Sequence, residues 1–245
     1  VHLGWCGTHQ MRIESLADGR RMLQAGELLR PGELELEPGG EYQSPRLYLC
    51  HSCHGQNGLT SQWHQMIRRE FIAKQHPASM RRPVQLNTWE ALYFGVDEAS
   101  VLALVDQAAS LGIERFVLDD GWLLGRTDDR RALGDWVVDP KKFPNGLTPI
   151  IEACHEKGME FGLWIEPEMV SQKSKLFETH PDWVLRHEGV PLNEARQQLV
   201  LDLSQPGVVS HLVDTVSSLL SAHHIAYIKW DMNRDIHQAG NAEGR

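Results

Sequence analysis

The segment from residue 227 to residue 234 holds the densest group of side chains that could do chemistry. Lys229, Asp231, Asn233 and Arg234 place two cations, one anion and one amide within six positions, directly after three β-prone residues. A buried strand does not accept such a group, so the pattern indicates a strand whose far end opens into a polar pocket. Lys229 and Asp231 project from the same face of that strand because they are two positions apart. A nearby cation favours ionised Asp231, the state that a nucleophile needs, although a plain ion pair would use the same spacing.

Three further segments combine tryptophan with acidic residues. They are Asn87-Thr88-Trp89-Glu90, Asp119-Asp120-Gly121-Trp122 and Trp164-Ile165-Glu166-Pro167-Glu168. A pyranose ring has an apolar face that stacks on indole and hydroxyls that donate to carboxylates, so this combination is typical of a sugar site. Asp119 and Asp120 would suit two neighbouring hydroxyls, although a helix cap or an arginine partner would also account for Asp119. Glu166 and Glu168 are rival carboxylates, and either could be catalytic or could hold its loop in shape.

Short apolar strands and amphipathic helices alternate around these segments. Strands are predicted at 84–86, 113–118, 161–165 and 225–230, and helices at 97–111, at 148–157 and from Ser204 onward. Gly112 and Gly158 stop the first two helices, and Thr148 is the expected N-cap of the second. The order β-α-β-α-β-α-β implies a parallel sheet.

The carboxyl ends of the predicted strands distinguish between two folds with parallel sheets. Each end carries a tryptophan and at least one acid. A doubly wound sheet gathers its ligands at one switch point, whereas the strand ends of a (β/α)8 barrel all converge. No Gly-x-Gly-x-x-Gly motif of a dinucleotide-binding fold follows the first strand. We therefore predict the α/β class and the first four β/α units of a (β/α)8 TIM barrel.

Residues 1–80 have a different pattern, in which apolar and polar residues alternate. The Leu-Glu-Leu-Glu segment at 34–37 has the strict period of two that is typical of a half-exposed strand. Turns are predicted at Pro31-Gly32, Pro38-Gly39-Gly40 and Asn57-Gly58. A short helix is predicted over 61–71, followed by a linker from His76 to Pro83. We place the domain boundary in this linker, between a β-rich domain of residues 1–80 and an α/β domain of residues 81–245.

Composition argues against several classes of partner. A formal charge of -9 and a pI near 5.8 disfavour nucleic acid and anionic membranes, and no apolar run reaches the ~20 residues of a membrane span. No signal peptide opens the chain and four cysteines make no disulfide framework, so we expect a reducing, cytoplasmic location. The chain starts at Val1 and stops at Arg245 without a closing element, and we expect it to be cut at both ends. The segment Cys50-His51-Ser52-Cys53-His54 matches a haem-attachment motif, but a single Cys-x-x-Cys is a weak signal for haem or metal.

Six motifs follow one another along residues 83–245. They are Asn87-Thr88-Trp89-Glu90-Ala91-x-Tyr93-Phe94, Asp119-Asp120-Gly121-Trp122, Leu133-Gly134-Asp135-Trp136, Phe143-Pro144-Asn145-Gly146-Leu147, Trp164-Ile165-Glu166-Pro167-Glu168-Met169-Val170 and Lys229-Trp230-Asp231-Met232-Asn233-Arg234. Together they resemble glycoside hydrolase family 36, the family of retaining α-galactosidases, and especially its bacterial members. The β-rich start is similar to the end of that family's N-terminal β-sandwich domain. The resemblance therefore implies part of a β-sandwich followed by the first half of the catalytic barrel.

The resemblance also implies a role for each site residue. Asp231 would be the nucleophile at the end of the fourth barrel strand. Asp119 and Asp120 would hold the axial 4-hydroxyl and the 6-hydroxyl of galactose. The remaining hydroxyls would be bound by Lys229, Asn233 and Arg196, while Trp164 would line the sugar site and Trp89 would stand near its entrance. Without the resemblance, we would take Arg196 for a solvated side chain.

The activity implied is the hydrolysis of terminal α-D-galactosyl residues from oligosaccharides such as raffinose or melibiose, through a covalent galactosyl-aspartate. In this family a second aspartate on a later barrel strand is the general acid/base. It does not occur in these residues, so we expect the chain alone to be inactive. The family needs neither metal nor organic cofactor, and the resemblance suggests a homotetramer. Three alternatives stay open: galactosyl transfer as in a raffinose-type synthase, action on α-N-acetylgalactosaminides, and a non-catalytic galactose-binding module.

Overall fold

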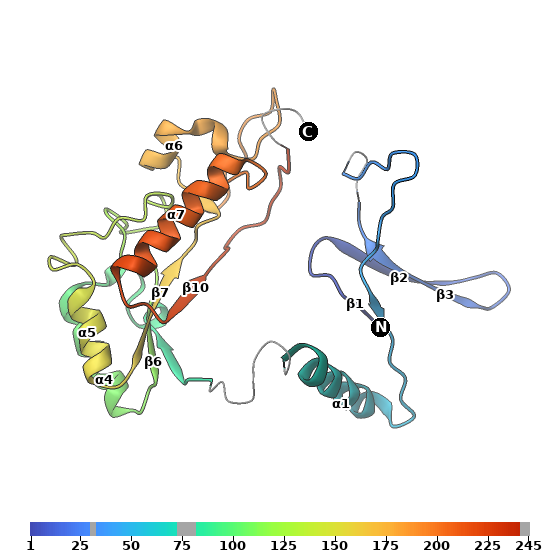
Figure 1. The fold of residues 1–245 in the computed structure, drawn as a ribbon, viewed down its shortest axis with the longest axis horizontal. Coiled ribbons are helices and arrows are strands. Elements are labelled where there is room, and N and C mark those ends of the chain that lie inside the picture. The colour runs from blue at the N-terminus through green and yellow to red at the C-terminus, as the bar shows by residue number, and fades with distance from the viewer. Residues whose placement is uncertain (30–32, 73–81, 241–245) are drawn as a thin grey trace. The chain divides into compact units, whose positions relative to one another are not determined.

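The computed structural model describes residues 1–29, 33–72 and 82–240. The chain divides into two compact units, Val1–Arg81 and Arg82–Arg245, and each is described by itself (Figure 1). The predicted linker lies outside the described residues up to Arg81, as does the predicted turn at Pro31-Gly32.

The first unit contains two pairs of antiparallel strands and a helix. Strand β1 (His2–Leu3) pairs with β4 (Leu47–Tyr48), and β2 (His9–Ser15) forms a long hairpin with β3 (Arg21–Glu27). Helix α1 (Gly55–Ile67) continues into one π-helical turn, η1 (Arg68–Ile72). The helix predicted over 61–71 is therefore present, but it begins six residues earlier.

Two local predictions for the first unit are wrong. Residues 34–37 form no strand, and both Leu34 and Leu36 are exposed. Alternation alone does not hold a strand, which needs a hydrogen-bonded partner, and none among the described residues pairs with this segment. Asn57-Gly58 lies in the first turn of α1 and not in a loop. The predicted turn at Pro38-Gly39-Gly40 is present, with Gly39 at a φ of 87°.

The second unit is built on a four-stranded parallel sheet. Its strands are β5 (Gln85–Asn87), β6 (Arg115–Leu118), β7 (Glu160–Ile165) and β10 (Tyr227–Trp230). They lie in the order β10-β7-β6-β5, so each strand pairs with the next one along the chain. A doubly wound sheet would reverse this order at its switch point, whereas a barrel does not. The predicted α/β class and barrel-type order are therefore confirmed.

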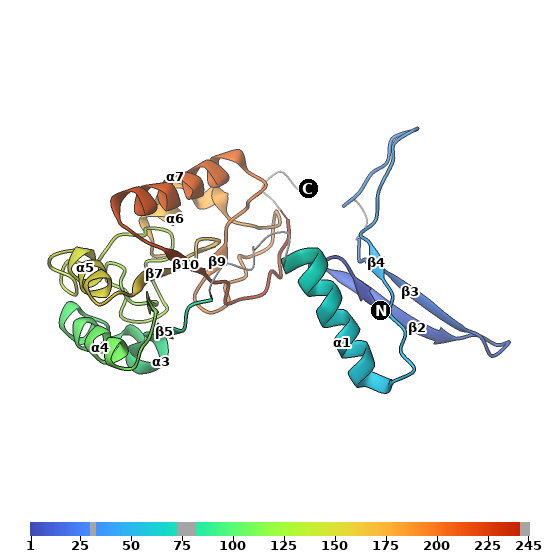
Figure 2. The ribbon, with the colours of Figure 1, turned by 60° about the horizontal axis from the view of Figure 1, so that its bottom comes forward.

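Three long helices connect these strands. They are α4 (Glu98–Ser110), α5 (Thr148–Glu156) and α7 (Pro206–Ala222), and Figure 2 shows them following one another along one face of the sheet. Helix α4 starts at a capping box. The Asp97 carboxylate accepts from the backbone N–H of Ser100, and the Ser100 hydroxyl accepts from the backbone N–H of Asp97. The predicted cap of α5 by Thr148 is wrong, because the buried Leu147 occupies that position and makes no side-chain cap.

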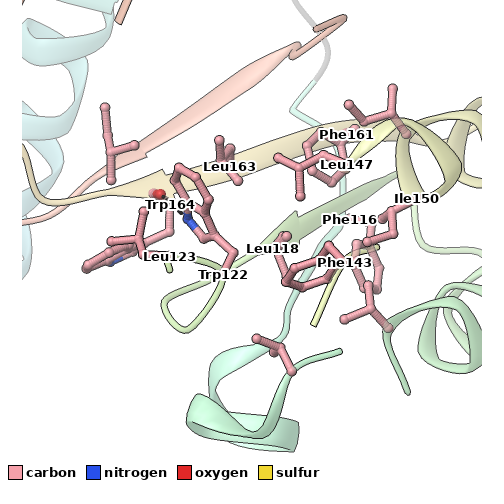
Figure 3. Packing of buried hydrophobic residues seen from close by; sticks show 14 of the residues in the cluster. Phe116, Leu118, Trp122, Leu123, Phe143, Leu147, Ile150, Phe161, Leu163 and Trp164 are labelled. Carbon is pink, nitrogen blue, oxygen red and sulfur yellow. Dashed lines mark hydrogen bonds between the residues drawn. The ribbon is translucent and has the colours of Figure 1, made fainter. Parts of the chain in front are cut away.

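The core lies between the sheet and helices α4 and α5. Aromatic and aliphatic side chains from β6, β7, the loop that follows β6 and the two helices fill it (Figure 3). The members labelled in the figure are Phe116, Leu118, Trp122, Leu123, Phe143, Leu147, Ile150, Phe161, Leu163 and Trp164. Each is at most 1% exposed. This burial anchors the carboxyl ends of β6 and β7, where the acidic residues begin.

Several short elements complete the second unit and were not predicted. After β5 come the helical turns α3 (Trp89–Leu92) and η2 (Tyr93–Gly95). Between β7 and α7 come β8 (Met169–Val170), α6 (Lys175–Thr179), η3 (Pro181–Trp183) and β9 (Leu199–Val200). Strands β8 and β9 pair with each other and, with α6 and α7, form a second small apolar cluster. This cluster fixes the loop that carries Arg196 and Gln198.

Candidate active site

A pocket of about 510 Å³ opens where the parallel strands end. All of the site residues predicted from the sequence line it: Trp89, Asp119, Asp120, Trp164, Arg196, Lys229, Asp231 and Asn233. They come from the carboxyl ends of β5, β6, β7 and β10 and from the loop before β9. A pocket of this size is ordinary for a small ligand. The strand ends therefore converge as the barrel-type order requires.

Asp231 is the first residue after β10, and its backbone N–H donates to the carbonyl of Ile165 at 2.9 Å. Its Oδ2 accepts from Trp164 Nε1 and Asn233 Nδ2, both at 2.9 Å, and its Oδ1 accepts from the Met232 backbone at 3.1 Å. Burial alone would raise the pKa of Asp231, but these hydrogen bonds and the charge of Lys229 hold that pKa below its ordinary value. The carboxylate is therefore ionised, half-buried and turned toward the pocket.

Lys229 pairs with Asp119 and not with Asp231, the partner that the two-residue spacing favours. Its Nζ donates to Oδ2 of Asp119 at 2.7 Å. Lys229 and Asp231 both line the pocket, but the ammonium hydrogen-bonds to Asp119, which follows the strand β6. The amide of Asn87 donates to the same Oδ2 at 2.6 Å, so groups from the ends of β5, β6 and β10 meet at one oxygen. The lysine then acts on Asp231 through its charge and on Asp119 through a hydrogen bond.

Asp120 is held by a residue that the sequence did not single out. Arg126 donates from Nε to Oδ1 at 2.5 Å and from Nη2 to Oδ2 at 2.7 Å, a bidentate pair. Burial raises the pKa of Asp120, while the guanidinium of Arg126 opposes that rise. The arginine partner considered for Asp119 therefore belongs to its neighbour. Arg126 could have been sought as the counter-charge that two adjacent buried acids require.

Trp164 is 1% exposed and serves as a donor as well as a wall. Its indole N–H reaches Asp231, and its backbone carbonyl accepts from Trp122 Nε1 at 3.0 Å. Trp136 packs near both indoles, with ring centroids 6.4 Å from Trp122 and 6.3 Å from Trp164. Trp89, which is half-buried, packs edge-on against Phe94, and both residues line the pocket. The two predicted indoles, Trp89 and Trp164, thus both border the site.

Arg196 enters the pocket from a tight hairpin turn. Ala195 and Gln198 exchange backbone hydrogen bonds, and the two residues between them, Arg196 and Gln197, take positive φ values of 52° and 59°. Positive φ at both central positions is the signature of a type I′ turn, which usually carries Asn or Gly. The exposed Arg196 guanidinium lies 3.4 Å from the carbonyl of Asn233 and lines the pocket. Arg196 therefore lines the pocket, as the resemblance implies, and its side chain is also exposed, as the simpler interpretation expects.

The rival carboxylates of the β7 loop are now distinguished. Glu166 is 1% exposed, lines the pocket and accepts from the backbone of Asn233 and the amide of Gln198. Burial raises its pKa above the ordinary value. Glu168 does not line the pocket and accepts instead from the exposed indole of Trp230. Gln198 was missed as well, because nothing in its sequence neighbours marks it.

Among the residues that the structure describes, no group of three or more His, Cys, Asp and Glu side chains is arranged to hold a metal ion. In the haem-like motif, the thiol of Cys50 donates to the side chain of Gln62. No helix in the described ranges is both long and apolar enough to cross a membrane.

A parallel sheet whose strands follow chain order, with a polar pocket at their carboxyl ends, defines an α/β protein of the barrel type. The chain belongs to the Melibiase family, whose model matches residues 41–245. This agrees with the resemblance to glycoside hydrolase family 36, since solved structures of that family match the chain as well.

Two kinds of relative show how far the similarity reaches. An α-galactosidase of Escherichia coli is 47% identical over 245 residues, an alignment that covers 100% of this chain and 34% of that protein. Crystal structures of variants of the α-galactosidase AgaA from Geobacillus stearothermophilus, in complex with stachyose and with raffinose, match with TM-scores of 0.87 and 0.85 at 37% identity. Each match covers 98% of this chain and 33% of the other. The chain thus spans about a third of the length of the relatives it matches.

Proposed function

We propose that this chain forms the galactose-binding and nucleophile-bearing part of a retaining α-galactosidase, which hydrolyses terminal α-D-galactosyl residues of oligosaccharides such as raffinose and melibiose. The observation that carries the proposal is an ionised Asp231 carboxylate, held by Trp164 and Asn233 and turned into a pocket lined by Asp119 and Lys229. The α-galactosidase of E. coli and the AgaA complexes with stachyose and raffinose support the substrate class.

Substrate binding would use charge as well as shape. Asp119 and Asp120 offer carboxylate oxygens to sugar hydroxyls, while Lys229, Arg196 and the amide of Asn233 offer donors. We assign to Asp119 and Asp120 the 4- and 6-hydroxyls of galactose. A hydrogen bond between a neutral hydroxyl and a charged group is worth roughly 1.5–3 kcal/mol, so a few such contacts suffice to orient a sugar.

The reaction proceeds by two displacements. An oxygen of Asp231 bonds to the anomeric carbon while the glycosidic bond breaks, and the electron pair of that bond goes to the leaving oxygen, which takes a proton from a general acid. Water then bonds to the same carbon and gives its proton to the same group, now a base, while the electron pair of the ester bond returns to Asp231. Two inversions restore the α configuration.

This mechanism needs a second carboxyl group, about 5–5.5 Å from the first in retaining enzymes. We assign the role to an aspartate on a later barrel strand, outside these 245 residues. General acid/base catalysis contributes roughly 10²–10⁴-fold, so the chain alone is expected to have little or no activity.

Location and assembly are part of the proposal. A cytoplasmic protein is supported by Cys6, Cys50, Cys53 and Cys154, which are all unpaired thiols. A homotetramer is supported by the family resemblance.

The test is Asp231→Asn in the full-length protein, with Asp235→Asn as the matched control. Asp235 is exposed, lies four residues further on and does not line the pocket. Because the amide cannot form the galactosyl ester, we expect kcat on p-nitrophenyl α-galactoside to fall by about 10⁴-fold or more. Calorimetry with galactose should show that the Kd changes by about threefold at most, since the other sugar contacts persist.

The control variant Asp235→Asn should keep the wild-type kcat and the wild-type Kd for galactose. Turnover that survives in Asp231→Asn would remove this residue from the chemistry. If wild type and variant both bind galactose and neither turns over an α-galactoside, the protein is a galactose-binding module and the proposed activity is wrong.

A further inference from the structure

Glu166 contacts the nucleophile segment, residues 231–233, and has no role in the mechanism above. It directly follows Ile165, the last residue of β7, and its side chain is buried to 1% exposure. Oε1 accepts from the backbone N–H of Asn233 at 2.7 Å, and Oε2 accepts from Nε2 of Gln198 at 3.3 Å. Both oxygens therefore serve as acceptors toward the protein.

The contact with Asn233 continues the sheet beyond its last strand. The backbone N–H of Asp231 donates to the carbonyl of Ile165, as in the regular parallel ladder. Two residues further on, the N–H of Asn233 would need another backbone carbonyl, but the carboxylate of Glu166 accepts it instead. The segment from Asp231 to Asn233 is thus held at both ends by two consecutive residues of a buried strand end.

The contact between Glu166 and Asn233 affects the nucleophile, because Asn233 in turn contacts Asp231. The side-chain amide of Asn233 donates to Oδ2 of Asp231 at 2.9 Å, so the direction of the carboxylate depends on where the backbone of Asn233 is fixed. Gln198 contacts both Glu166 and the residue that follows Asn233, since its backbone carbonyl accepts from Nη1 of Arg234 at 2.6 Å. Gln198 is itself 1% exposed, and its Oε1 is buried without a partner among the described residues.

We propose that Glu166 is a positioning residue that aims the Asp231 carboxylate, acting through the backbone of Asn233 and braced by Gln198. The inference rests on the proposed glycosidase function of the pocket. Glu168 provides the contrast, because it lies on the same loop and bonds to the exposed Trp230 indole instead of the nucleophile segment.

Three variants of the full-length protein test this role: Glu166→Ala, Glu166→Gln and the control Glu168→Gln. Glu166→Ala frees the Asn233 backbone, and a small misplacement of a catalytic group can cost about 100-fold in rate, so we expect kcat to fall by about that factor. The Kd for galactose should rise by a smaller factor than kcat falls, because Asp119 and Lys229 do not depend on Glu166 for their positions and only the Asn233 contact with the sugar does.

Glu166→Gln should recover most of the activity. The new side-chain carbonyl can accept from Asn233, and the new N–H₂ group can donate to Oε1 of Gln198 after that amide rotates. We expect its kcat to lie within about tenfold of wild type, between the values of the two other variants. Glu168→Gln should be indistinguishable from wild type.

The outcomes separate this inference from the function it rests on. An active wild type with unchanged kcat in Glu166→Ala would overturn the positioning role and leave the glycosidase intact. A parallel decline of kcat, galactose affinity and melting temperature in both Glu166 variants would also overturn that role, because the residue would then be only structural. A wild type that binds galactose without turnover would overturn both the positioning role and the glycosidase function.

Discussion

Two ion pairs, Asp120–Arg126 and Asp119–Lys229, form two walls of the pocket, and they differ in how much of each pair is exposed to solvent. On one wall the side chains of Asp120 and Arg126 are 8% and 1% exposed, and Arg126 makes a third hydrogen bond to the carbonyl of Arg131. On the other wall Lys229 is 34% exposed, although its partner Asp119 is buried at 3%. Both members of the first pair are almost inaccessible to solvent, whereas the second pair keeps its lysine accessible, and each pair presents one carboxylate to the pocket.

The difference shows how a rigid frame and a responsive surface coexist in one pocket. Breaking a buried ion pair leaves an uncompensated charge, so the Asp120–Arg126 wall is expected to control stability. A partly exposed cation can exchange partners at low cost, so the Asp119–Lys229 wall is expected to control ligand binding. Asp231 belongs with the second wall.

The largest effect is expected from Arg126→Ala. It strands the buried carboxylate of Asp120, which should lower the free energy of unfolding of the full-length protein by about 3–5 kcal/mol. Arg130→Ala is the control, because Arg130 forms an exposed pair with Asp128 in the same loop. Urea denaturation followed by tryptophan fluorescence measures both. Equal losses of unfolding free energy in Arg126→Ala and Arg130→Ala would show that the buried Asp120–Arg126 pair contributes no more to stability than an exposed pair.

Lys229→Met should act mainly on binding. Losing a charged donor is expected to weaken galactose binding by about ten- to a hundredfold, measured by calorimetry on the full-length protein. Stability should fall less than in Arg126→Ala, because Asp119 retains the Asn87 amide and the half-exposed lysine leaves room for water. A stability loss as large as that of Arg126→Ala, with binding unchanged, would show that both walls are structural.

The smallest effect is a shift of pH dependence in Trp164→Phe. This change removes one donor from Asp231 and keeps an aromatic ring in the core, so the pKa of Asp231 should rise toward its ordinary value. In the proposed mechanism Asp231 must be ionised to attack, so the acidic limb of kcat/KM should move to higher pH, with activity kept above that limb. Trp122→Phe is the control, because its lost bond goes to the Trp164 carbonyl and not to the nucleophile. A limb that stays in place in Trp164→Phe would show that this hydrogen bond does not set the charge of Asp231.

Much of the second unit could be predicted from its sequence because local signals agree with the fold. Apolar strand segments alternate with helices of clear period, and each strand delivers its polar residues at its carboxyl end. Since the carboxyl ends of sequential parallel strands meet, residues such as Asp119 and Asp231 were expected to converge although 112 positions separate them. The periodicity of the apolar residues and the polar residues at the strand ends were enough to predict this convergence.

Partner choice within the pocket could not be predicted, because it depends on distances across strands. The i, i+2 spacing of Lys229 and Asp231 gives a shared face, but the lysine bonds to Asp119 on another strand. Arg126 reaches Asp120 only because the loop after β6 folds back on itself, and no periodicity encodes that path. In the first unit, residues 34–37 alternate between apolar and polar as a strand does, but no described segment pairs with them, and they form no strand.

The unequal surroundings of the two carboxylate oxygens of Asp231 have a stereochemical consequence. Oδ2 already receives two N–H donors, whereas Oδ1 receives one from the Met232 backbone. A carboxylate oxygen needs an unshared lone pair to bond to carbon, so in the proposed mechanism Oδ1 is the oxygen that attacks. Oδ2 would then become the carbonyl oxygen of the acylal, still hydrogen-bonded to Trp164 and Asn233. In the proposed mechanism, the hydrogen bonds that Asp231 makes without substrate therefore determine which of its oxygens carries the sugar.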